Sequence, residues 1–324
     1  MKIRLLVAAA LALCAFYVFR VPRFASTPAP AKTFQEAMAK FSALQKEEEA
    51  LPLRPEGRSR IFSHGKKTAR VFVLLHGLTN CPEQFVPLAR ILFDSGANVV
   101  LPRARYAGYA DRLNDLQGLQ SGQDLLDQAA VGLDIAAGLG DRVSLVGLSG
   151  SAVAAAWMAE NREGIESVLL LSPFFSLYGH PVWMIDFLSA VLSKLPNFYK
   201  WWNDDLQDKL PGPPYVYPRY GSRCMADTVQ LSRNVRANMD RRPLQCGRMD
   251  ILITGTDVGA NNNLSRKMEE DWNARSPGSV TLFEFPKQDG VPHDMVDRFQ
   301  PDQKTAISYP KILQLLSVSP SARP

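Results

Sequence analysis

Cysteine is scarce in this chain of 324 residues, which has Cys only at positions 14, 81, 224 and 246. No two of them form a Cys-x-x-C pair, so the sequence lacks the usual spacing of a zinc site or a dithiol redox motif. Four thiols are also too few to staple a fold of this length. If the chain faces an oxidising compartment, Cys224 and Cys246 are the favoured pair, because the loop between them is short enough to close.

Histidine and long basic runs are scarce as well. The formal charge is +5 at pH 7, but Lys and Arg are dispersed along the chain, so we expect no nucleic-acid partner. Four His limit the choice of a catalytic base to a few positions. No internal repeat occurs, and 46% hydrophobic residues suffice for one large core, with or without an inserted subdomain.

The N-terminus carries an uncharged apolar run over residues 5–19, between the basic residues Lys2 and Arg4 and the pair Arg20 and Arg23. A full membrane span takes about 20 residues, so the run is short. We expect residues 1–24 to be an uncleaved anchor in the inner membrane, with the remainder extracytoplasmic; a cleaved signal peptide is the alternative. Residues 25–32 are rich in Pro and Ala and are expected to form a stiff linker.

Strands and helices alternate along residues 33–324, which we expect to form one domain. This alternation predicts an α/β fold, with a mostly parallel sheet covered by helices on both faces. The rhythm breaks from residue 173 to about 247, where Phe, Tyr, Trp and Pro are frequent and no strand of the sheet is expected. We interpret this segment as an inserted, mainly helical cap.

One stretch organises the chain: an apolar strand ends at Gly147-Leu148-Ser149-Gly150-Ser151, and an Ala-rich helix follows. A sharp strand-to-helix turn forces its central residue into strained dihedrals and exposes that side chain, as in the nucleophile elbow Gly-x-Ser-x-Gly. Ser151 departs from this pattern at the last position. The alternative is an ordinary loop serine between two glycines.

A nucleophilic serine needs a base and an acid that orients the base. His293 lies in the loop after the last strand, and Asp257 directly follows the strand before it, which completes the order Ser, Asp, His. Two other roles are open: Asp257 could cap the next helix, and His293 could bind only backbone.

The anion formed during acyl transfer needs backbone donors, which such folds take from the residue after the nucleophile and from a loop after an earlier strand. Gly150 and Leu78 occupy these places. His76 lies beside Leu78, and we interpret it as a structural residue of that loop.

Four motifs together carry a resemblance to a known family. They are Leu74-Leu75-His76-Gly77-Leu78-Thr79, Gly147-Leu148-Ser149-Gly150-Ser151, Gly255-Thr256-Asp257 and Pro292-His293-Asp294. The chain resembles the α/β-hydrolases of the bacterial carboxylesterase and monoacylglycerol-lipase type over about residues 58–317.

This resemblance implies an eight-stranded, mostly parallel sheet, a triad of Ser149, Asp257 and His293, an acyl-enzyme intermediate, and neither cofactor nor metal. A second departure, after Ser151, is the loop at residues 103–108, where many relatives have a Gly-His-Gly turn. The departure at this loop bears on the substrate class more than on the mechanism.

The predicted function is therefore the hydrolysis of carboxylic esters with lipid-like or medium-chain acyl groups. The alternatives are a thioesterase or serine peptidase with the same triad, or a membrane-tethered binding protein without turnover. Aromatic residues of the cap are expected to form the acyl pocket, although each could instead pack within the cap. They are Trp183, Phe187, Trp201 and Trp202.

Overall fold

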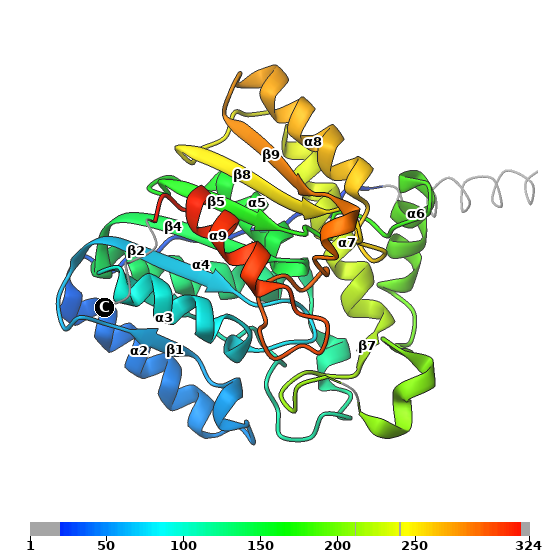
Figure 1. Ribbon diagram of the computed structural model, residues 1–324, viewed down its shortest axis with the longest axis horizontal. Coiled ribbons are helices and arrows are strands. Elements are labelled where there is room, and N and C mark those ends of the chain that lie inside the picture. The colour runs from blue at the N-terminus through cyan, green and yellow to red at the C-terminus, as the bar shows by residue number, and fades with distance from the viewer. Residues whose placement is uncertain (1–19, 211, 240, 319–324) are drawn as a thin grey trace, which may run out of the picture.

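A twisted seven-stranded sheet forms the centre of the computed structural model, which describes residues 20–318 except 211 and 240 (Figure 1). Only β1 runs antiparallel to its neighbour, so the prediction of a mostly parallel sheet is confirmed. The strand order is β1 (Arg60–Phe62), β3 (Asn98–Leu101), β2 (Thr68–Leu75), β4 (Gly140–Leu148), β5 (Ser167–Leu171), β8 (Arg248–Thr254) and β9 (Val280–Phe285).

Helices cover both faces of the sheet. Successive residues of β2 point to opposite faces, so Val73 packs in the core on one side and Leu74 in the core on the other. Helices α4 (Gly122–Leu139), α5 (Gly150–Asn161) and α8 (Asn262–Arg275) lie on the Val73 side, with α2 (Phe34–Glu49) and α7 (Ser222–Met239) packed outside them. Helices α3 (Val86–Asp94) and α9 (Thr305–Leu315) lie on the Leu74 side.

The expectation of eight strands is wrong for the described residues, because the chain ahead of β1 forms α2 in place of a further strand. The Thr33 hydroxyl caps this helix by accepting from the Glu36 amide at 3.1 Å. Pro52 and Pro55 follow the end of the helix, and proline has no N–H to donate to a strand ladder. A short 3₁₀ turn, η1 (Pro55–Gly57), leads instead into β1.

The expected anchor at residues 1–24 lies mostly outside the described residues, which begin at Arg20. Among the helices of the described part of the chain, none is long and apolar enough to cross a membrane. Residues 25–32, the expected linker, contain no helix or strand, and they lie on the domain instead of standing free of it. Asp134 of α4 binds them twice, with its carboxylate at the Ala29 amide (3.1 Å) and its carbonyl at the Ala31 amide (2.8 Å).

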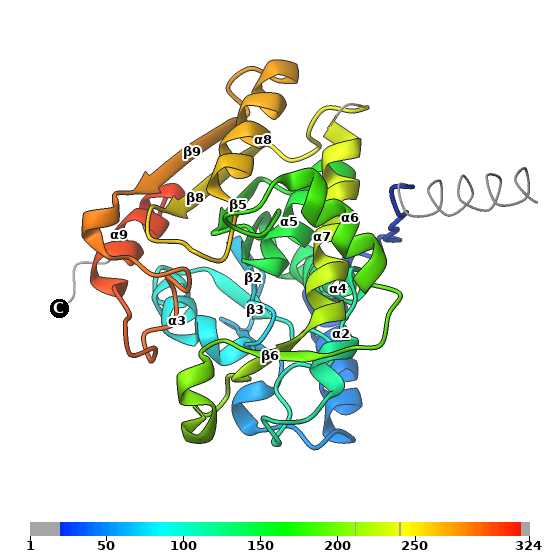
Figure 2. The same ribbon diagram turned by 90° about the vertical axis from the view of Figure 1, so that its right-hand side faces the viewer.

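The segment between β5 and β8 contains α6 (Val182–Leu192), η4 (Asp204–Lys209), a separate hairpin of β6 (Tyr199–Trp201) and β7 (Arg219–Gly221), and α7. Figure 2 shows α6 alongside α7. The predicted cap at 173–247 is longer than the part that stands apart from the sheet layers. Leu231, Val235 and Met239 of α7 belong to the same core as α5, so this face of α7 packs on the main domain, while Val229 packs with Ile185 of α6.

Cys81, Cys224 and Cys246 are free and buried. The favoured pairing of Cys224 with Cys246 is therefore wrong, and the physical reason is α7. Cys224 lies in the first turn of this helix and Cys246 lies beyond its end. A helix of 18 residues holds its two ends about 27 Å apart, far beyond the reach of a disulfide.

Candidate active site

Ser149 sits in the turn between β4 and α5 with φ 57° and ψ −117°, a conformation that a residue with a side chain rarely adopts. Its backbone is held from three directions. The Ser149 amide donates to the Leu171 carbonyl at 2.9 Å, and the Ser149 carbonyl accepts from the amides of Ala152 and Phe174 at 3.2 and 3.1 Å. Such over-determined strain is typical of functional turns, and it leaves the Ser149 side chain half-buried at the sheet edge.

Two small residues make this turn possible. A Cβ on Gly147 would lie 2.7 Å from the Ser151 carbonyl oxygen, and a Cβ on Gly150 would lie 2.5 Å from Leu78 Cγ. Ser151 is tolerated at the last position because its side chain points away from the turn. Its hydroxyl donates to the His76 carbonyl at 2.6 Å and lies 3.1 Å from Gln128 Oε1, so α5 is tied to the loop that follows β2.

Asp257 and His293 are brought together from separate loops, with Asp257 Oδ2 2.6 Å from His293 Nδ1. The other Asp257 oxygen accepts from the amides of Gly259 and Ala260 at 2.8 and 2.9 Å. Neither alternative role applies, since Asn261 caps α8 and the His293 ring binds a carboxylate. The described residues include no hydrogen bond from Ser149 Oγ to His293; in unliganded enzymes this contact is often long.

The electrostatics of the pair favour an ion pair at pH values between the lowered pKa of Asp257 and the raised pKa of His293. Burial raises the pKa of Asp257, but His293 and the two backbone amides lower it more, so the net shift is downward. Burial lowers the pKa of His293, whereas the charge of Asp257 and its hydrogen bond raise it, and the net shift is upward. An ionised Asp257 fixes the proton on Nδ1 and leaves Nε2 of neutral His293 free to accept a proton.

His76 is fully buried, and burial lowers its pKa to about 4, so the ring is neutral. Its Nε2 accepts from the Ala104 amide at 3.0 Å, which leaves Nδ1 to donate to the Gly77 carbonyl at 2.8 Å. The loop at 103–108, where many relatives have a Gly-His-Gly turn, thus holds His76 in place. This matches a structural role for His76.

The backbone amides of Leu78 and Gly150 lie in adjacent loops, since the Leu78 side chain packs against Gly150. Within the described residues neither amide donates to a protein acceptor. Gly150 is also the first residue of α5, where the helix dipole favours negative charge. Both amides are therefore available to an anion, as an oxyanion hole requires.

No protein-family model and no curated protein matches the sequence. Solved structures do match the fold. One belongs to the metagenome-derived lipolytic enzymes LipS and LipT (14% identity, TM-score 0.59, 82% of this chain and 99% of that one). Another is the monoacylglycerol lipase of Paleococcus ferrophilus (19%, 0.59, 81% and 98%), and a third is a soluble variant of the Saccharomyces cerevisiae monoglyceride lipase (15%, 0.59, 80% and 91%). The chain has the α/β-hydrolase fold.

Within this α/β-hydrolase fold, the four cap residues occupy different surroundings. Trp183 and Phe187 of α6 are 71% and 41% exposed, so they do not line an enclosed acyl pocket. Trp201 is half-buried in the β6–β7 hairpin. Trp202 is also 50% exposed, but of the four it alone reaches the loop after β2, where its indole N–H donates to Thr79 Oγ1 at 3.0 Å.

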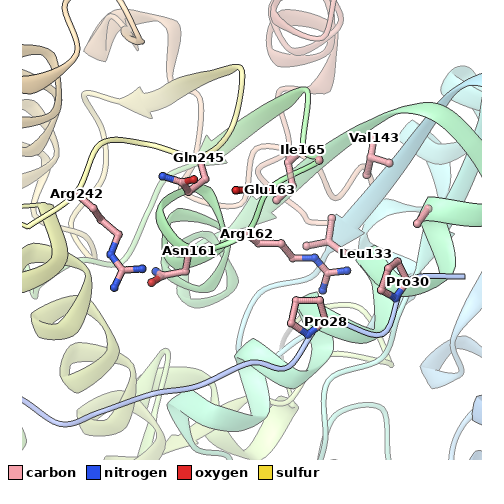
Figure 3. Close-up of a pocket in the computed structure, with 12 residues that line it drawn as sticks. Pro28, Pro30, Leu133, Val143, Asn161, Arg162, Glu163, Ile165, Arg242 and Gln245 are labelled. Atoms are coloured by element: carbon pink, nitrogen blue, oxygen red, sulfur yellow. The ribbon is translucent and has the colours of Figure 1, made fainter.

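A groove of about 780 Å³ lies away from these residues (Figure 3). Arg162 and Ile165 line it after the end of α5, together with Pro28 and Pro30 of the N-terminal segment. Ser149 lies at the opposite end of α5, and a helix of 12 residues is about 18 Å long. The groove is therefore not part of the candidate site.

Three polar residues at the site escaped sequence reasoning. They are Gln84, Tyr215 and Asp297: Gln84 in η2 (Pro82–Phe85) joins Gly77 to Asp294, and Tyr215 donates to Asp297 at 2.8 Å. Their partners are remote in sequence, and the only sequence signal was Asp294 beside His293. Across the described ranges, no three His, Cys, Asp or Glu side chains cluster as metal ligands would.

Proposed function

We propose that the protein is a serine hydrolase that cleaves carboxylic esters, with Ser149 as the nucleophile, His293 as the base and Asp257 as the group that orients the base. One observation carries the proposal: the 2.6 Å contact between Asp257 and His293, in a fold whose strained β4–α5 turn presents Ser149. The neighbouring structures, whose names describe lipases, support the same reaction class.

In this mechanism Ser149 Oγ attacks the ester carbonyl carbon while His293 Nε2 takes the hydroxyl proton. The amides of Leu78 and Gly150 stabilise the oxyanion that develops on the carbonyl oxygen. His293 then returns the proton to the leaving alcohol, and the acyl group stays on Ser149. His293 then deprotonates a water molecule, which attacks the acyl-enzyme; the bond between the acyl carbon and Ser149 Oγ breaks, His293 returns the proton to Oγ, and the acid is released.

The finer proposal is a lipid-like or medium-chain acyl group. It is supported by the names of the neighbours, which include monoacylglycerol lipases, and by the apolar side chains that the cap carries. Trp202 is the cap residue with the best support for contact with substrate, because it binds Thr79 next to Leu78. The same triad could serve thioesters or peptide bonds, and the assay below separates these classes.

The first test uses a fluorophosphonate probe and the variant Ser149→Ala. We expect the wild type to be labelled at Ser149 and the variant to lose ester turnover by roughly 10⁶-fold, as when other hydrolases lose a triad serine. Wild-type turnover by Ser149→Ala would overturn the proposal. A folded wild type that resists the probe and leaves every ester intact would favour a binding protein.

The second test is a series of p-nitrophenyl esters from C2 to C12 beside acyl-thioesters and aminoacyl amides. Each buried methylene contributes about 0.8 kcal/mol, so kcat/KM should rise by up to about 15-fold per added pair of carbons until the pocket is full. A preference for acetate, with steady loss toward longer chains, would contradict the lipid-like substrate.

For the location we propose an extracytoplasmic enzyme held at the inner membrane by its N-terminal apolar run. The support is the sequence of residues 5–19 between basic flanks. Fractionation of cells that express the full chain with a C-terminal tag tests this. Tagged protein in the membrane fraction, released by detergent but not by high salt, is expected; tagged protein in the cytosolic fraction would contradict it.

A further inference from the structure

Gln84 is a buried glutamine whose two amide atoms bind two different loops of the site. Its Oε1 accepts from the Gly77 amide at 2.8 Å, and its Nε2 donates to Asp294 Oδ2 at 2.8 Å. Gly77 directly precedes Leu78, and Asp294 directly follows His293. One side chain therefore connects the backbone that bears an oxyanion donor to the backbone that bears the base.

The orientation of the Gln84 amide is fixed by its partners. A flipped amide would set Nε2 against the Gly77 N–H and Oε1 against the Asp294 carboxylate, and both contacts would repel. Asp294 is itself tied to its own loop, since its Oδ1 accepts from the Asp297 amide at 3.2 Å. Gln84 is only 2% exposed, whereas Asp294 is half-buried and its Oδ2 also accepts from Gln300 Nε2 at 3.3 Å within the same loop.

No backbone ladder performs this connection. The Gly77 loop follows β2 and the His293 loop follows β9, and β4, β5 and β8 lie between those strands. Four strand spacings amount to about 19 Å, so the His293 loop must cross the strand ends to approach the Gly77 loop. Among the described residues, side chains make this connection: Gln84 binds Asp294 and Asn80 binds Asp297, beside a shared apolar core that includes Phe85 and Val291.

We propose that Gln84 is a positioning residue that sets the spacing between the oxyanion donor Leu78 and the base His293. Its hydrogen-bond partners among the described residues are the Gly77 amide and the Asp294 carboxylate, not Ser149, Asp257 or His293 themselves. This inference rests on the proposed ester hydrolysis, because the spacing has an effect only if both loops act on one carbonyl group. A shift of about 1 Å in such an arrangement can cost up to 10²-fold in rate.

The experiment compares Gln84→Leu with Gln117→Leu. Gln117 is also 2% exposed and also bound at both ends, by the Gly221 amide and the Cys224 thiol, but it touches neither loop. We expect Gln84→Leu to lower kcat by about 10- to 100-fold with little change in KM, and Gln117→Leu to leave kcat near that of the wild type. Equal kcat values for the two variants would overturn the proposal.

Gln84→Glu gives a readout that general destabilisation does not. The glutamate still accepts from Gly77, and when protonated it still donates to Asp294. When the proton is lost at higher pH, two carboxylates face each other and the bond is broken. The ratio of variant to wild-type kcat should therefore fall as the pH rises from about 5.5 to about 9, and a constant ratio would overturn the proposal.

Using a ratio removes the titration that both proteins share. The titratable and charged groups that face Asp294 and its loop are present in both proteins: His293, Asp297, Tyr215, Tyr309 and Arg298. A negative charge at position 84 raises the pKa of His293 further, and this alone would make the ratio rise with pH, so a falling ratio reports the broken bond to Asp294. If Gln84→Leu does not fold, the pH dependence of the kcat ratio for Gln84→Glu tests the proposal by itself. An inactive wild type would overturn the proposed function and this inference with it, whereas an active wild type with unaffected Gln84 variants overturns this inference alone.

Discussion

The loop that carries His293 and helix α6 of the cap both belong to regions of irregular sequence rhythm, yet they are built in opposite ways. In the loop, polar side chains are buried and bonded: Asp297 is fully buried and accepts from Tyr215. On α6, large apolar side chains face water, and Trp183 is 71% exposed. The loop thus buries polar side chains, whereas α6 exposes apolar ones.

This difference predicts how each region responds to amino-acid substitution. A buried polar group whose partner is removed costs about 1–3 kcal/mol, so the loop around His293 is held in one arrangement. Burial, and secondarily the charge of Asp294, raise the pKa of Asp297 to about 7, while the hydrogen bonds from the Phe299 amide, Tyr215 and Asn80 oppose that shift. An exposed apolar side chain has no such partner to lose, so we expect α6 to accept substitutions that the His293 loop does not.

Among substitutions in the surroundings of His293, the largest loss of activity is expected for Asp257→Asn. Loss of the carboxylate removes the group that orients His293, and the corresponding change in serine proteases lowers kcat about 10⁴-fold. In the wild type only neutral His293 can accept the proton, and its pKa is raised, so the rate should rise with pH along a limb above 6.5.

In Asp257→Asn the charge that raises the pKa of His293 is gone while burial still lowers it. The residual activity should therefore reach its plateau at lower pH than that of the wild type. Steady-state kcat/KM across the pH range measures both effects. If kcat/KM of Asp257→Asn rose over the same pH range as that of the wild type, the assignment of His293 as the titrating base would be contradicted.

Ser151→Ala is expected to have a smaller effect than Asp257→Asn, and this effect is mainly a loss of stability. The substitution removes the hydroxyl that donates to the buried His76 carbonyl, at a cost of about 1–3 kcal/mol in the free energy of unfolding. Ser151→Gly would restore the usual elbow pattern, but it loses the same bond and adds the helix penalty of glycine, so it should be less stable still.

Ser265→Ala is the matched control for Ser151. Both serines are fully buried near the start of a helix, but within the described residues the Ser265 hydroxyl has no hydrogen-bond partner. Urea unfolding of the three variants measures the difference. If Ser265→Ala is as destabilising as Ser151→Ala, the bond to His76 is not what stabilises the elbow.

The parts of the molecule that sequence could predict are those set by local pattern. Buried strands, the turn at Ser149 and the residues that follow β8 and β9 were found because apolar runs and their ends are visible in sequence. Whether Gln84 would face Asp294, or Trp202 would face Thr79, depends on how distant loops cross the sheet, and no spacing rule encodes that. The unexpected number of strands has a local cause, the capped helix at Thr33.

The smallest effect is expected within the cap, where Trp202→Phe is compared with Trp183→Phe. Both substitutions keep an aromatic ring, but only the first removes a hydrogen bond, the one from the indole N–H to Thr79. A bond of this kind contributes about 0.5–1.5 kcal/mol, so kcat/KM should fall about 2- to 10-fold in Trp202→Phe. Trp183→Phe should stay within about 0.5 kcal/mol of the wild type, because its ring lies in solvent.

The measurement is kcat/KM for a short and a long p-nitrophenyl ester with both variants. A loss in Trp202→Phe that is equal for the two esters indicates a displaced Thr79 loop, since that loop acts on the carbonyl common to both. A loss confined to the long ester indicates contact between Trp202 and the acyl chain. If Trp183→Phe instead slows the long ester more than Trp202→Phe does, the outer face of α6 takes part in acyl binding, and the contrast between the His293 loop and the cap fails.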